Sequence, residues 1–366
     1  MKKIISIVII VILFTGCNNS TTATYTVENK DGIEVIKNDN IPADPDYKIK
    51  MRLSADLNFD EISQKDTSNA VQLNNIELDQ YGNMYVLDAR KSKIHKFDKY
   101  GKRLVTFGER GQGPGEFIGA GFFVVWHDTV YVPFNQQFKI LKFDTDGNFI
   151  TDKRYEDPRD FPRAFWKTRN FVTGISMIPL PEEGEAVFKR NLNLFNDKFN
   201  KLKTFMEDRV DFGTNIFDLN LVRNPCVAVS SDSLVYLPRY SYNDYIIDVY
   251  DFYGNKRQVI KKKYRKIAFT ENEISQFQVF LDRNGLTAKG KFKNSITLIS
   301  MDKYDRLWVL AAQPESEKRK LYDIFEKGIY INTVEIEADS TDIVDFVENK
   351  LVAFDAVNNK MKYYDY

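Results

Sequence analysis

The sequence predicts an all-β protein: a six-bladed β-propeller of four-stranded antiparallel blades, closed by an N-terminal strand and carrying one short helical insertion. Two observations support this prediction. The last copy of a repeated pattern ends one strand short, while a spare strand precedes the first copy. The repeated pattern is a strand that ends in Phe/Tyr-Asp (or Asn) before a turn, and these positions lie 42 to 72 residues apart, at Asp98, Asp144, Asn196, Asp251, Asp323 and Asp365. Such spacing suits propeller blades of roughly 40 to 50 residues with insertions.

The first residues are typical of an export signal. A basic start precedes an apolar run at 4–14, which is shorter than the roughly 20 residues that a membrane-spanning helix needs. The run leads into Thr-Gly-Cys, which resembles the bacterial lipobox, although Phe14 stands where that motif usually has Leu. We therefore expect a signal peptide at 1–16, lipidation of Cys17 and a polar tether at 17–30. The alternative is an ordinary secretory signal with a coincidental cysteine.

The spare strand lies at residues 47–53. Apolar and basic side chains alternate there with a period of two, as in a half-buried strand. An incomplete last blade would leave a hydrophobic edge open to pairing with other chains. We therefore predict that this segment completes the sixth blade, and that deletion of residues 45–55 unfolds the ring.

Six copies of the repeat can be followed along the chain. Each has a turn with Asp or Gly and then an alternating aromatic and β-branched strand. The third and fifth copies are eroded but recognisable. The copies begin near residues 78, 128, 170, 232, 302 and 348.

Aspartates recur at the turns of these copies. A carboxylate in such a position accepts hydrogen bonds from backbone N–H groups of the turn. We therefore interpret the following residues as structural, and not as catalytic groups: Asp79, Asp98, Asp144, Asp146 and Asp251.

Two insertions carry arginine and aromatic residues, which are the commonest anchors of binding surfaces. Residues 155–166 connect the second and third copies, and 238–244 lie within the fourth. A repeat fold usually keeps its frame and varies the loops on one face, so these insertions are the best guide to specificity. The alternative is that the rings simply pack between blades. The predicted ligand-binding residues are Arg159, Arg163, Trp166, Arg239, Tyr240 and Tyr242.

A third insertion, at about 264–294, has the only good helix signal. Thr270 and Glu273 form a capping box, and Asn284-Gly285 ends the pattern. We expect this helix to pack across one rim of a propeller that spans 31–366. Its apolar face either covers the propeller or docks a partner. The residues that share this face are Ile274, Phe277 and Leu281.

The linker after the first copy carries a specific motif. Residues 108–117, Gly-Glu-Arg-Gly-Gln-Gly-Pro-Gly-Glu-Phe, resemble the signature that joins neighbouring blades in NHL-type repeats. With the lipobox and the six copies, the chain is similar to the NHL-like six-bladed propeller lipoproteins of Bacteroides-type bacteria. This resemblance implies a fold and an envelope location, and no particular chemistry. A phosphate-binding loop is disfavoured, because Pro114 lacks an N–H group and Glu116 repels anions.

Composition argues against several classes of function. The 52 Lys and Arg residues balance 52 Asp and Glu, so the chain has no general attraction for nucleic acid. His95, in a strand, and His127, beside a turn, have no neighbouring ligands at zinc spacing, and we expect surface roles for both. Cys226 reads as a buried packing residue in preference to a nucleophile. The basic run at 261–266 is a solvated strand end or, alternatively, a contact for an anionic partner.

These observations predict a non-catalytic binding or scaffold protein, held at the outer membrane by lipid on Cys17 and facing the periplasm. Its expected ligand is a protein or glycan, and we expect a monomer without a resident cofactor. The main alternative is a calcium-dependent propeller hydrolase or lyase with a site at the central channel, where ligands from several blades would leave no spacing signal. A third interpretation is a purely structural part of a larger envelope complex.

Overall fold

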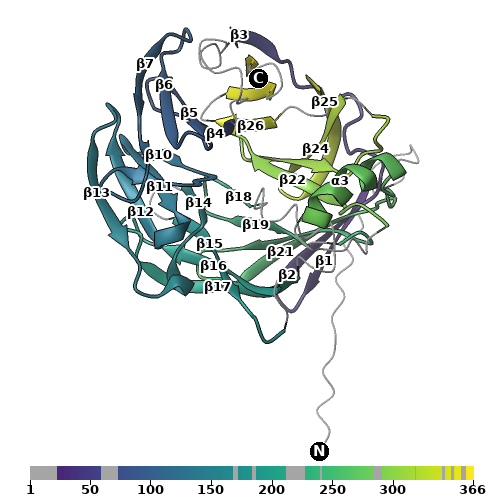
Figure 1. The fold of residues 1–366 in the computed structure, drawn as a ribbon. Helices are drawn as coiled ribbons and strands as arrows, with labels where there is room; N and C mark the ends of the chain where they lie inside the picture. The colour runs from purple at the N-terminus through teal and green to yellow at the C-terminus, as the bar shows by residue number, and fades with distance from the viewer. Residues whose placement is uncertain are drawn as a thin grey trace, which may run out of the picture.

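The protein is a ring of six sheets (Figure 1). The computed structural model describes residues 23–366 with the exception of 59–72, 168–171, 184–186, 212–226, 240, 284–290, 318, 340–342, 348–349 and 356–359. Each sheet is built on four antiparallel strands, which are consecutive in the chain except that the last blade takes its fourth strand from the N-terminal region, so the predicted six-bladed β-propeller is confirmed. The predicted lipidation site Cys17 and the residues Tyr240 and Cys226 lie outside the described residues.

The first three blades follow the chain in order. Blade 1 contains β4 (Leu73–Leu78), β5 (Met84–Asp88), β6 (Lys93–Phe97) and β7 (Arg103–Phe107). Blade 2 contains β10 (Val124–Trp126), β11 (Thr129–Phe134), β12 (Lys139–Asp144) and β13 (Phe149–Arg154). Blade 3 contains β14 (Ala164–Lys167), β15 (Val172–Pro179), β16 (Val187–Phe195) and β17 (Lys201–Asp211).

The remaining blades close the ring. Blade 4 contains β18 (Ala228–Val229), β19 (Val235–Pro238), β20 (Tyr245–Tyr250) and β21 (Lys256–Lys262). Blade 5 contains β22 (Ile296–Met301), β23 (Arg306–Ala311), β24 (Arg319–Glu326) and β25 (Ile329–Asp339). Blade 6 contains β26 (Ile343–Val347), β27 (Lys350–Asp355), β28 (Lys360–Asp365) and, from the N-terminal region, β3 (Arg52–Asn58).

The hydrophobic core is divided among the blade interfaces. Six clusters of buried side chains in the described part of the chain each join two neighbouring blades, and the first joins Met84 and Phe97 of blade 1 to Phe354 and Met361 of blade 6. The first strands of successive blades also contact one another, including β26 with β4 across the point of closure. Stability therefore depends on nearest-neighbour interfaces that are all present only when the ring is closed.

The N-terminal strand β3 closes blade 6, as predicted. It pairs antiparallel with β28, with Arg52 opposite Asp365 and Leu57 opposite Met361. The predicted bounds of 47–53 were too early. Residues 47–51 make no sheet pairing, but Tyr47, Ile49 and Met51 pack on the cluster between blades 5 and 6. Their alternation therefore reports burial of every second side chain, which an extended segment shows without a hydrogen-bonded partner strand.

A second N-terminal element was not predicted. β1 (Tyr25–Lys30) and β2 (Ile33–Asn38) form a hairpin, and β2 pairs parallel with β21, so that blade 4 has six strands. The predicted tether at 17–30 therefore contains a strand from residue 25 onward. Asn38 fixes the hairpin, because its side-chain amide donates to the carbonyl of Gly328 at 3.0 Å and its oxygen accepts from the N–H of Tyr330 at 2.8 Å.

The segment between these two elements crosses blade 5. The N–H of Ala43 donates to Tyr330 at 3.0 Å, and the side chain of Asn332 donates to the carbonyls of Pro45 and Tyr47 at 3.1 Å. Residues 25–58 thus form a strap over blades 4, 5 and 6, which we call the N-terminal strap.

The tight turns confirm the structural interpretation of the aspartates. Asp79, Asp98 and Asp144 each accept N–H groups from two and four residues further on, at 2.8–3.0 Å. Asp251 accepts the N–H of Asn255 at 2.8 Å. Asp146 differs, because it lies exposed within the turn and its own N–H group donates to Asp144.

Two of these turns show why glycine is required. Gly147, with φ of +88°, faces the outer strand of the preceding blade, and a Cβ there would lie 2.7 Å from Phe107. Gly82, with φ of +80°, has its nearest atom 4.0 Å from that position. Both need the left-handed conformation, but only Gly147 also lies at a tight contact between blades.

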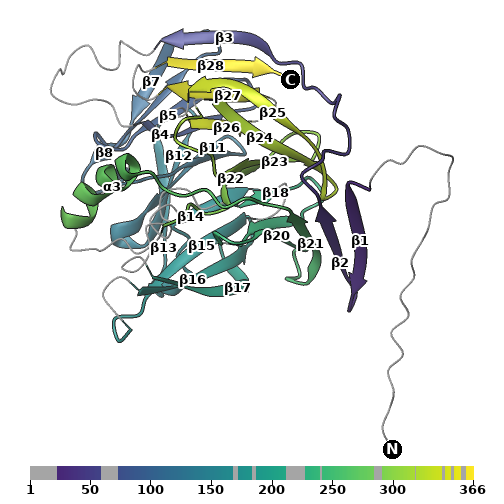
Figure 2. The same cartoon turned by 90° about the vertical axis from the view of Figure 1, so that its right-hand side faces the viewer.

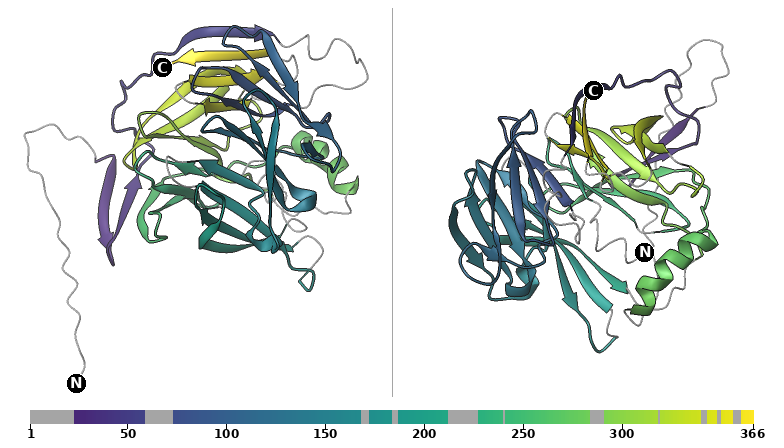
Figure 3. Two further views of the ribbon diagram at one scale, coloured as in Figure 1. Left: turned by 90° about the vertical axis from the view of Figure 1, so that its left-hand side faces the viewer. Right: turned by 45° about the horizontal axis from the view of Figure 1, so that its top comes forward.

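The order of strands defines two faces. The turns between the first and second and between the third and fourth strands lie on one face, which we call the tight-turn face. The remaining loops, and the links to the next blade, lie on the other, which we call the long-loop face. Figure 2 shows β8 (Glu109–Arg110) and α3 (Glu271–Arg283) on one side of the ring and the β1–β2 hairpin with the C-terminus on the opposite side, and Figure 3 agrees.

The predicted helix and linker are both found on the long-loop face. The α3 helix begins with the expected capping box, because the N–H of Thr270 donates to Glu273 at 3.0 Å and that of Glu273 to Thr270 at 3.2 Å. In the linker, β8 pairs with β9 (Glu116–Phe117), the Glu116 carboxylate accepts the N–H of Gly113 at 2.8 Å, and Phe117 is buried between blades 1 and 2. The motif thus joins two blades. Among the described residues, none of the helices has the length and apolar character that a bilayer crossing requires.

Candidate ligand-binding face

Both predicted insertions lie on the long-loop face, in neighbouring parts of the ring. Residues 155–163 link blade 2 to blade 3, and residues 239–244 connect the second and third strands of blade 4. Trp166 differs, because it lies in β14, the innermost strand of blade 3.

The linker at 155–163 is held firmly on blade 3. The hydroxyl of Tyr155 donates to the carbonyl of Phe199 at 2.8 Å, and that of Ser176 to the carbonyl of Phe161 at 2.9 Å. Lys201 pairs with Asp160 at 2.8 Å. A rigid linker keeps its side chains in place before a ligand arrives, which lowers the ordering cost of binding.

Arg159 is exposed but neutralised within this linker. In the short helix η2 (Pro158–Asp160), its Nε lies 2.8 and 2.9 Å from the two oxygens of the Asp157 carboxylate, and its Nη2 lies 2.6 Å from Oδ2. The side-chain and backbone hydrogen bonds from Arg159 lower the pKa of Asp157 to about 2. This local pair leaves little net charge for a ligand.

Arg163 differs from Arg159 in its burial and in its partners. Its backbone N–H donates to the carbonyl of Ile175 at 2.8 Å, which fixes the start of β14, and its side chain is half-buried. Within the described residues we find no carboxylate or hydrogen-bond acceptor for its guanidinium, and burial lowers the pKa of this group. A half-buried cation without a counter-charge favours an anionic or strongly accepting ligand group.

Arg239 braces blade 4 from within. Its guanidinium donates to Asp248 through Nε at 2.7 Å and Nη2 at 2.9 Å, and Lys256 lies 3.1 Å from the same carboxylate. Burial raises the pKa of Asp248, but the two cations outweigh this effect and the pKa is lowered. Arg239, although exposed, is thus committed to an ion pair with its own blade.

Trp166 is partly buried. It packs against the hydrophobic cluster between blades 3 and 4, and its ring centroid lies 6.3 Å from that of Phe122. The alternative interpretation, in which the ring packs between blades, describes this residue.

Tyr242 joins the loop at 239–244 to the helical insertion. Its ring stacks on Phe292, with centroids 6.0 Å apart and planes inclined by 17°, and Lys266 lies 5.4 and 5.5 Å from the two centroids. Ser295 ties the same loop to blade 5, because its N–H donates to Ser241 at 2.8 Å. The insertion, this loop and the start of blade 5 therefore form one continuous surface.

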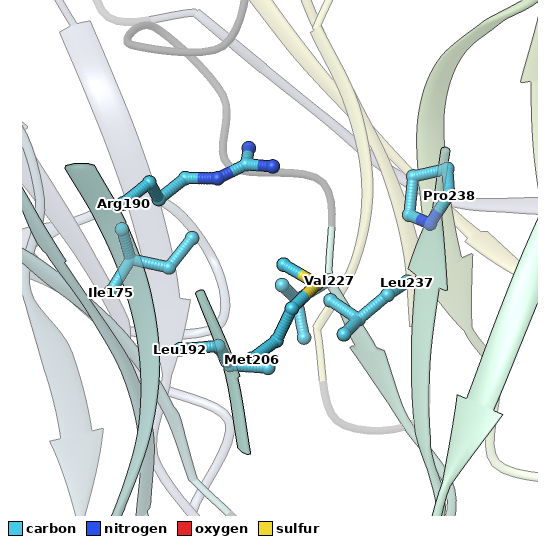
Figure 4. Close-up of a pocket in the computed structure, with 7 residues that line it drawn as sticks. All are labelled: Ile175, Arg190, Leu192, Met206, Val227, Leu237 and Pro238. Atoms are coloured by element: carbon cyan, nitrogen blue, oxygen red, sulfur yellow. The ribbon is translucent and has the colours of Figure 1, made fainter. Parts of the chain in front are cut away.

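A pocket between blades 3 and 4 contains an arginine that sequence reasoning missed. Figure 4 shows Arg190 extending across an apolar lining toward Pro238. The cavity of about 10 Å³ has room for roughly one water molecule, so it is not a substrate site. Arg190 lies in the eroded third copy, where it interrupts a strand of alternating apolar residues. That interruption is the signal that could have identified it. The other residues of the lining are Ile175, Leu192, Met206, Val227 and Leu237.

The histidines and acidic groups do not form a metal centre among the residues that the structure places. No group of three or more His, Cys, Asp or Glu side chains converges there. His127 lies in the turn between β10 and β11, as expected. The expected surface role of His95 was wrong, because only 6% of this residue is exposed. Burial lowers its pKa to about 4.

The basic run at 261–266, for which we expected a solvated strand end, is only partly solvated. Lys262 lies between blades 4 and 5, with its ammonium 2.8 Å from Asp323 and 4.0 Å from the ring centroid of Tyr330. Lys263 pairs instead with Asp39 of the N-terminal strap at 2.6 Å. Two of these cations thus stabilise the junction of blade 4 with its neighbours.

Comparison with known proteins agrees with the class that the fold defines: the protein is a six-bladed β-propeller. Residues 26–164 match a family model, DUF5128, described as a 6-bladed beta-propeller. No curated protein matches the chain.

Solved structures resemble the chain at low sequence identity. A DUF4221 family member from Bacteroides vulgatus has a TM-score of 0.53 at 12% identity, over 86% of this chain and 97% of the other. A protein of Bacteroides fragilis described as exported has a TM-score of 0.49 at 14% identity, over 90% and 99%. Virginiamycin B lyase from Staphylococcus aureus has a TM-score of 0.45 at 10% identity, over 87% and 100%. At these identities the similarity concerns the fold alone.

Proposed function

We propose that this propeller is a lipid-anchored, NHL-like envelope protein that binds a protein or glycan through its long-loop face without transforming it. The asymmetry of the two faces carries the proposal. Connections of the tight-turn face are short and uniform, whereas the long-loop face bears the linker at 155–163, the loop at 239–244 and the insertion at 263–295. Variable loops on a rigid scaffold are where binding residues concentrate.

Arg163 is the residue on which this proposal depends most. It is preorganised by the rigid linker and has no counter-charge among the described residues. We therefore expect a carboxylate, or a sugar hydroxyl that accepts its hydrogen bonds, to bind beside it. Tyr242 and Phe292 offer aromatic surface on the same face.

The proposed location depends on the N-terminal sequence. The basic and apolar leader and the Gly16-Cys17 pair support export and acylation, with the outer membrane and its periplasmic side as the proposed site. Mass spectrometry of residue 17 in the purified protein tests this directly, because acylation adds a defined mass to the mature N-terminus.

A crosslinking experiment tests the binding face. Asn243 is exposed on the long-loop face. A photoreactive amino acid at this position should crosslink to a single envelope protein, or to a glycan that a glycan array has first identified as the ligand. The same amino acid at Asp146, exposed on the tight-turn face, serves as the control and should give no such product. Equal products from both positions would contradict the proposal.

Two matched arginine variants then test the role of Arg163. Arg163→Gln should weaken binding of that ligand by about tenfold or more, because a hydrogen bond to a charged group contributes about 1.5–3 kcal/mol. Arg159→Gln, in the same linker but paired with Asp157, should leave affinity nearly unchanged. Equal losses would place the binding site elsewhere.

A further inference from the structure

The tight-turn face carries tyrosines at one repeated position. In four turns with the pattern Asp-x-Tyr-Gly or Asp-x-Tyr-Asp, the tyrosine follows two residues after the capping aspartate. These rings are strongly exposed: Tyr81 at 70%, Tyr100 at 76%, Tyr253 at 78% and Tyr304 at 59%. Because all four turns join the first to the second or the third to the fourth strand of a blade, all four rings lie on one face.

Exposed aliphatic side chains occur close to these turns. In every blade, the pairing of the third with the fourth strand shifts register, and in blades 1 to 5 this shift directly follows the turn that joins the two strands. The extra residue at this β-bulge is Leu104 in blade 1, Ile150 in blade 2 and Leu202 in blade 3, each about half exposed. Three consecutive blades therefore present apolar side chains next to the tyrosines.

On this face, lysines lie beside the exposed tyrosines, whereas the capping aspartates are turned toward the backbone. Lys99 and Lys303 lie 5.1 and 5.0 Å from the ring centroids of the tyrosines that follow them, Tyr100 and Tyr304. The aspartate of each turn points inward instead, because it accepts backbone N–H groups. Cations beside amphipathic rings thus remain available to an anionic surface, while the capping carboxylates are occupied and the exposed carboxylates of this face include Asp146 and Asp305.

The N-terminal strap leaves the ring on this same side. Figure 2 shows the β1–β2 hairpin on the side opposite α3, the side on which the C-terminal end of β28 also lies. Residue 23, the first described residue, comes only six positions after Cys17. A chain of that length spans at most about 20 Å, so an acyl group on Cys17 would hold the tight-turn face close to the lipid.

We propose that the tight-turn face rests on the membrane surface, with its tyrosines at the level of the lipid headgroups. Tyrosine is enriched at membrane interfaces because its ring is apolar and its hydroxyl is polar, and lysine beside it favours anionic lipid. This inference rests on the proposed lipidation of Cys17. It orients the molecule, with the long-loop face directed away from the membrane toward its ligand.

Fluorescence quenching tests the orientation in the full-length lipidated chain. A fluorescent amino acid is placed at Tyr100, Tyr253 or Asn243, and the protein is reconstituted into vesicles whose lipids carry a headgroup-attached quencher. We expect loss of fluorescence at positions 100 and 253 and none at position 243. A further variant, Tyr253→Ser with Tyr304→Ser, should reduce the quenching of a reporter at Tyr100, and circular dichroism verifies its fold.

The possible failures can be separated. A chain that floats with the vesicles but shows equal quenching at positions 100 and 243 keeps its anchor, and overturns the docked orientation. A chain that does not float and carries no acyl group at residue 17 overturns the anchor and the orientation with it. If the reporter at position 100 becomes shielded from solvent only after another envelope protein is added, this face is a protein interface. That result also overturns the proposal.

Discussion

Gly147 allows a quantitative test of how the blades are joined. Replacement by alanine imposes a left-handed conformation on a residue with a Cβ, which costs about 1–2 kcal/mol. The new Cβ would also lie 2.7–2.8 Å from three atoms of Phe107 in the outer strand of blade 1. Overpacking of this kind costs a further 1–3 kcal/mol or so, which makes an expected loss of about 2–5 kcal/mol in the free energy of unfolding.

Gly82→Ala provides the matched control. Gly82 belongs to the same type of turn and has φ of +80°, but the nearest atom to its added Cβ is 4.0 Å away. It should therefore lose only the conformational part, about 1–2 kcal/mol. Urea denaturation followed by circular dichroism measures both variants, and the slopes of the transitions show whether unfolding remains cooperative.

Removal of the neighbouring ring completes the test. In a double-mutant cycle with Phe107→Gly, which removes all three clashing atoms, the clash should disappear, so that Gly147→Ala costs about 1–3 kcal/mol less in that background than in the parent. Equal losses for Gly82→Ala and Gly147→Ala, or a cycle without coupling, would refute the idea that turn glycines set the spacing of the blades.

Three other predictions concern closure, pH and metal. Deletion of residues 45–55 removes most of β3 and should abolish the cooperative unfolding transition, so a truncated chain that melts at the parent temperature would contradict closure by this strand. His95 has its pKa lowered from 6.5 to about 4, so the unfolded chain binds more protons between these values and stability should fall by about 3 kcal/mol as the pH drops from 6.5 to 4. His95→Gln should flatten this dependence in denaturant titrations, and an unchanged slope would exclude His95 as its source. EDTA should leave the melting temperature unchanged, whereas a loss of several degrees together with stoichiometric calcium would favour the calcium-dependent hydrolase or lyase.

Turn chemistry explains why so much of the ring was predictable. The aspartates at 79, 98 and 144 act on N–H groups only two and four residues away, so a short stretch of sequence contains the whole interaction. The capping box of α3 is local in the same way. Repetition of these local signals was sufficient to count the blades and to identify the strand that closes them.

The N-terminal hairpin could not be predicted in this way. β2 pairs in parallel with β21, which places Glu34 opposite Gln258 across more than two hundred residues. Neither strand contains a sequence motif that identifies its partner. The pairing depends on the three-dimensional shape of the outer edge of blade 4, which forms only when the blade has folded. The partners of the predicted binding residues could not be read from the sequence for a related reason, because the neighbours that pair with Arg239 and pack against Trp166 come from other strands.

The N-terminal strap also determines how the molecule responds to force. Tension applied upstream of residue 23 should first load β1, which among the described strands pairs with β2 alone, and then the parallel pairing of β2 with β21. The ring-closing strand β3 bears the load only after both have been pulled away and the stretch across blade 5 has been drawn taut. We therefore expect the hairpin to detach first under tension, while the six blades stay intact.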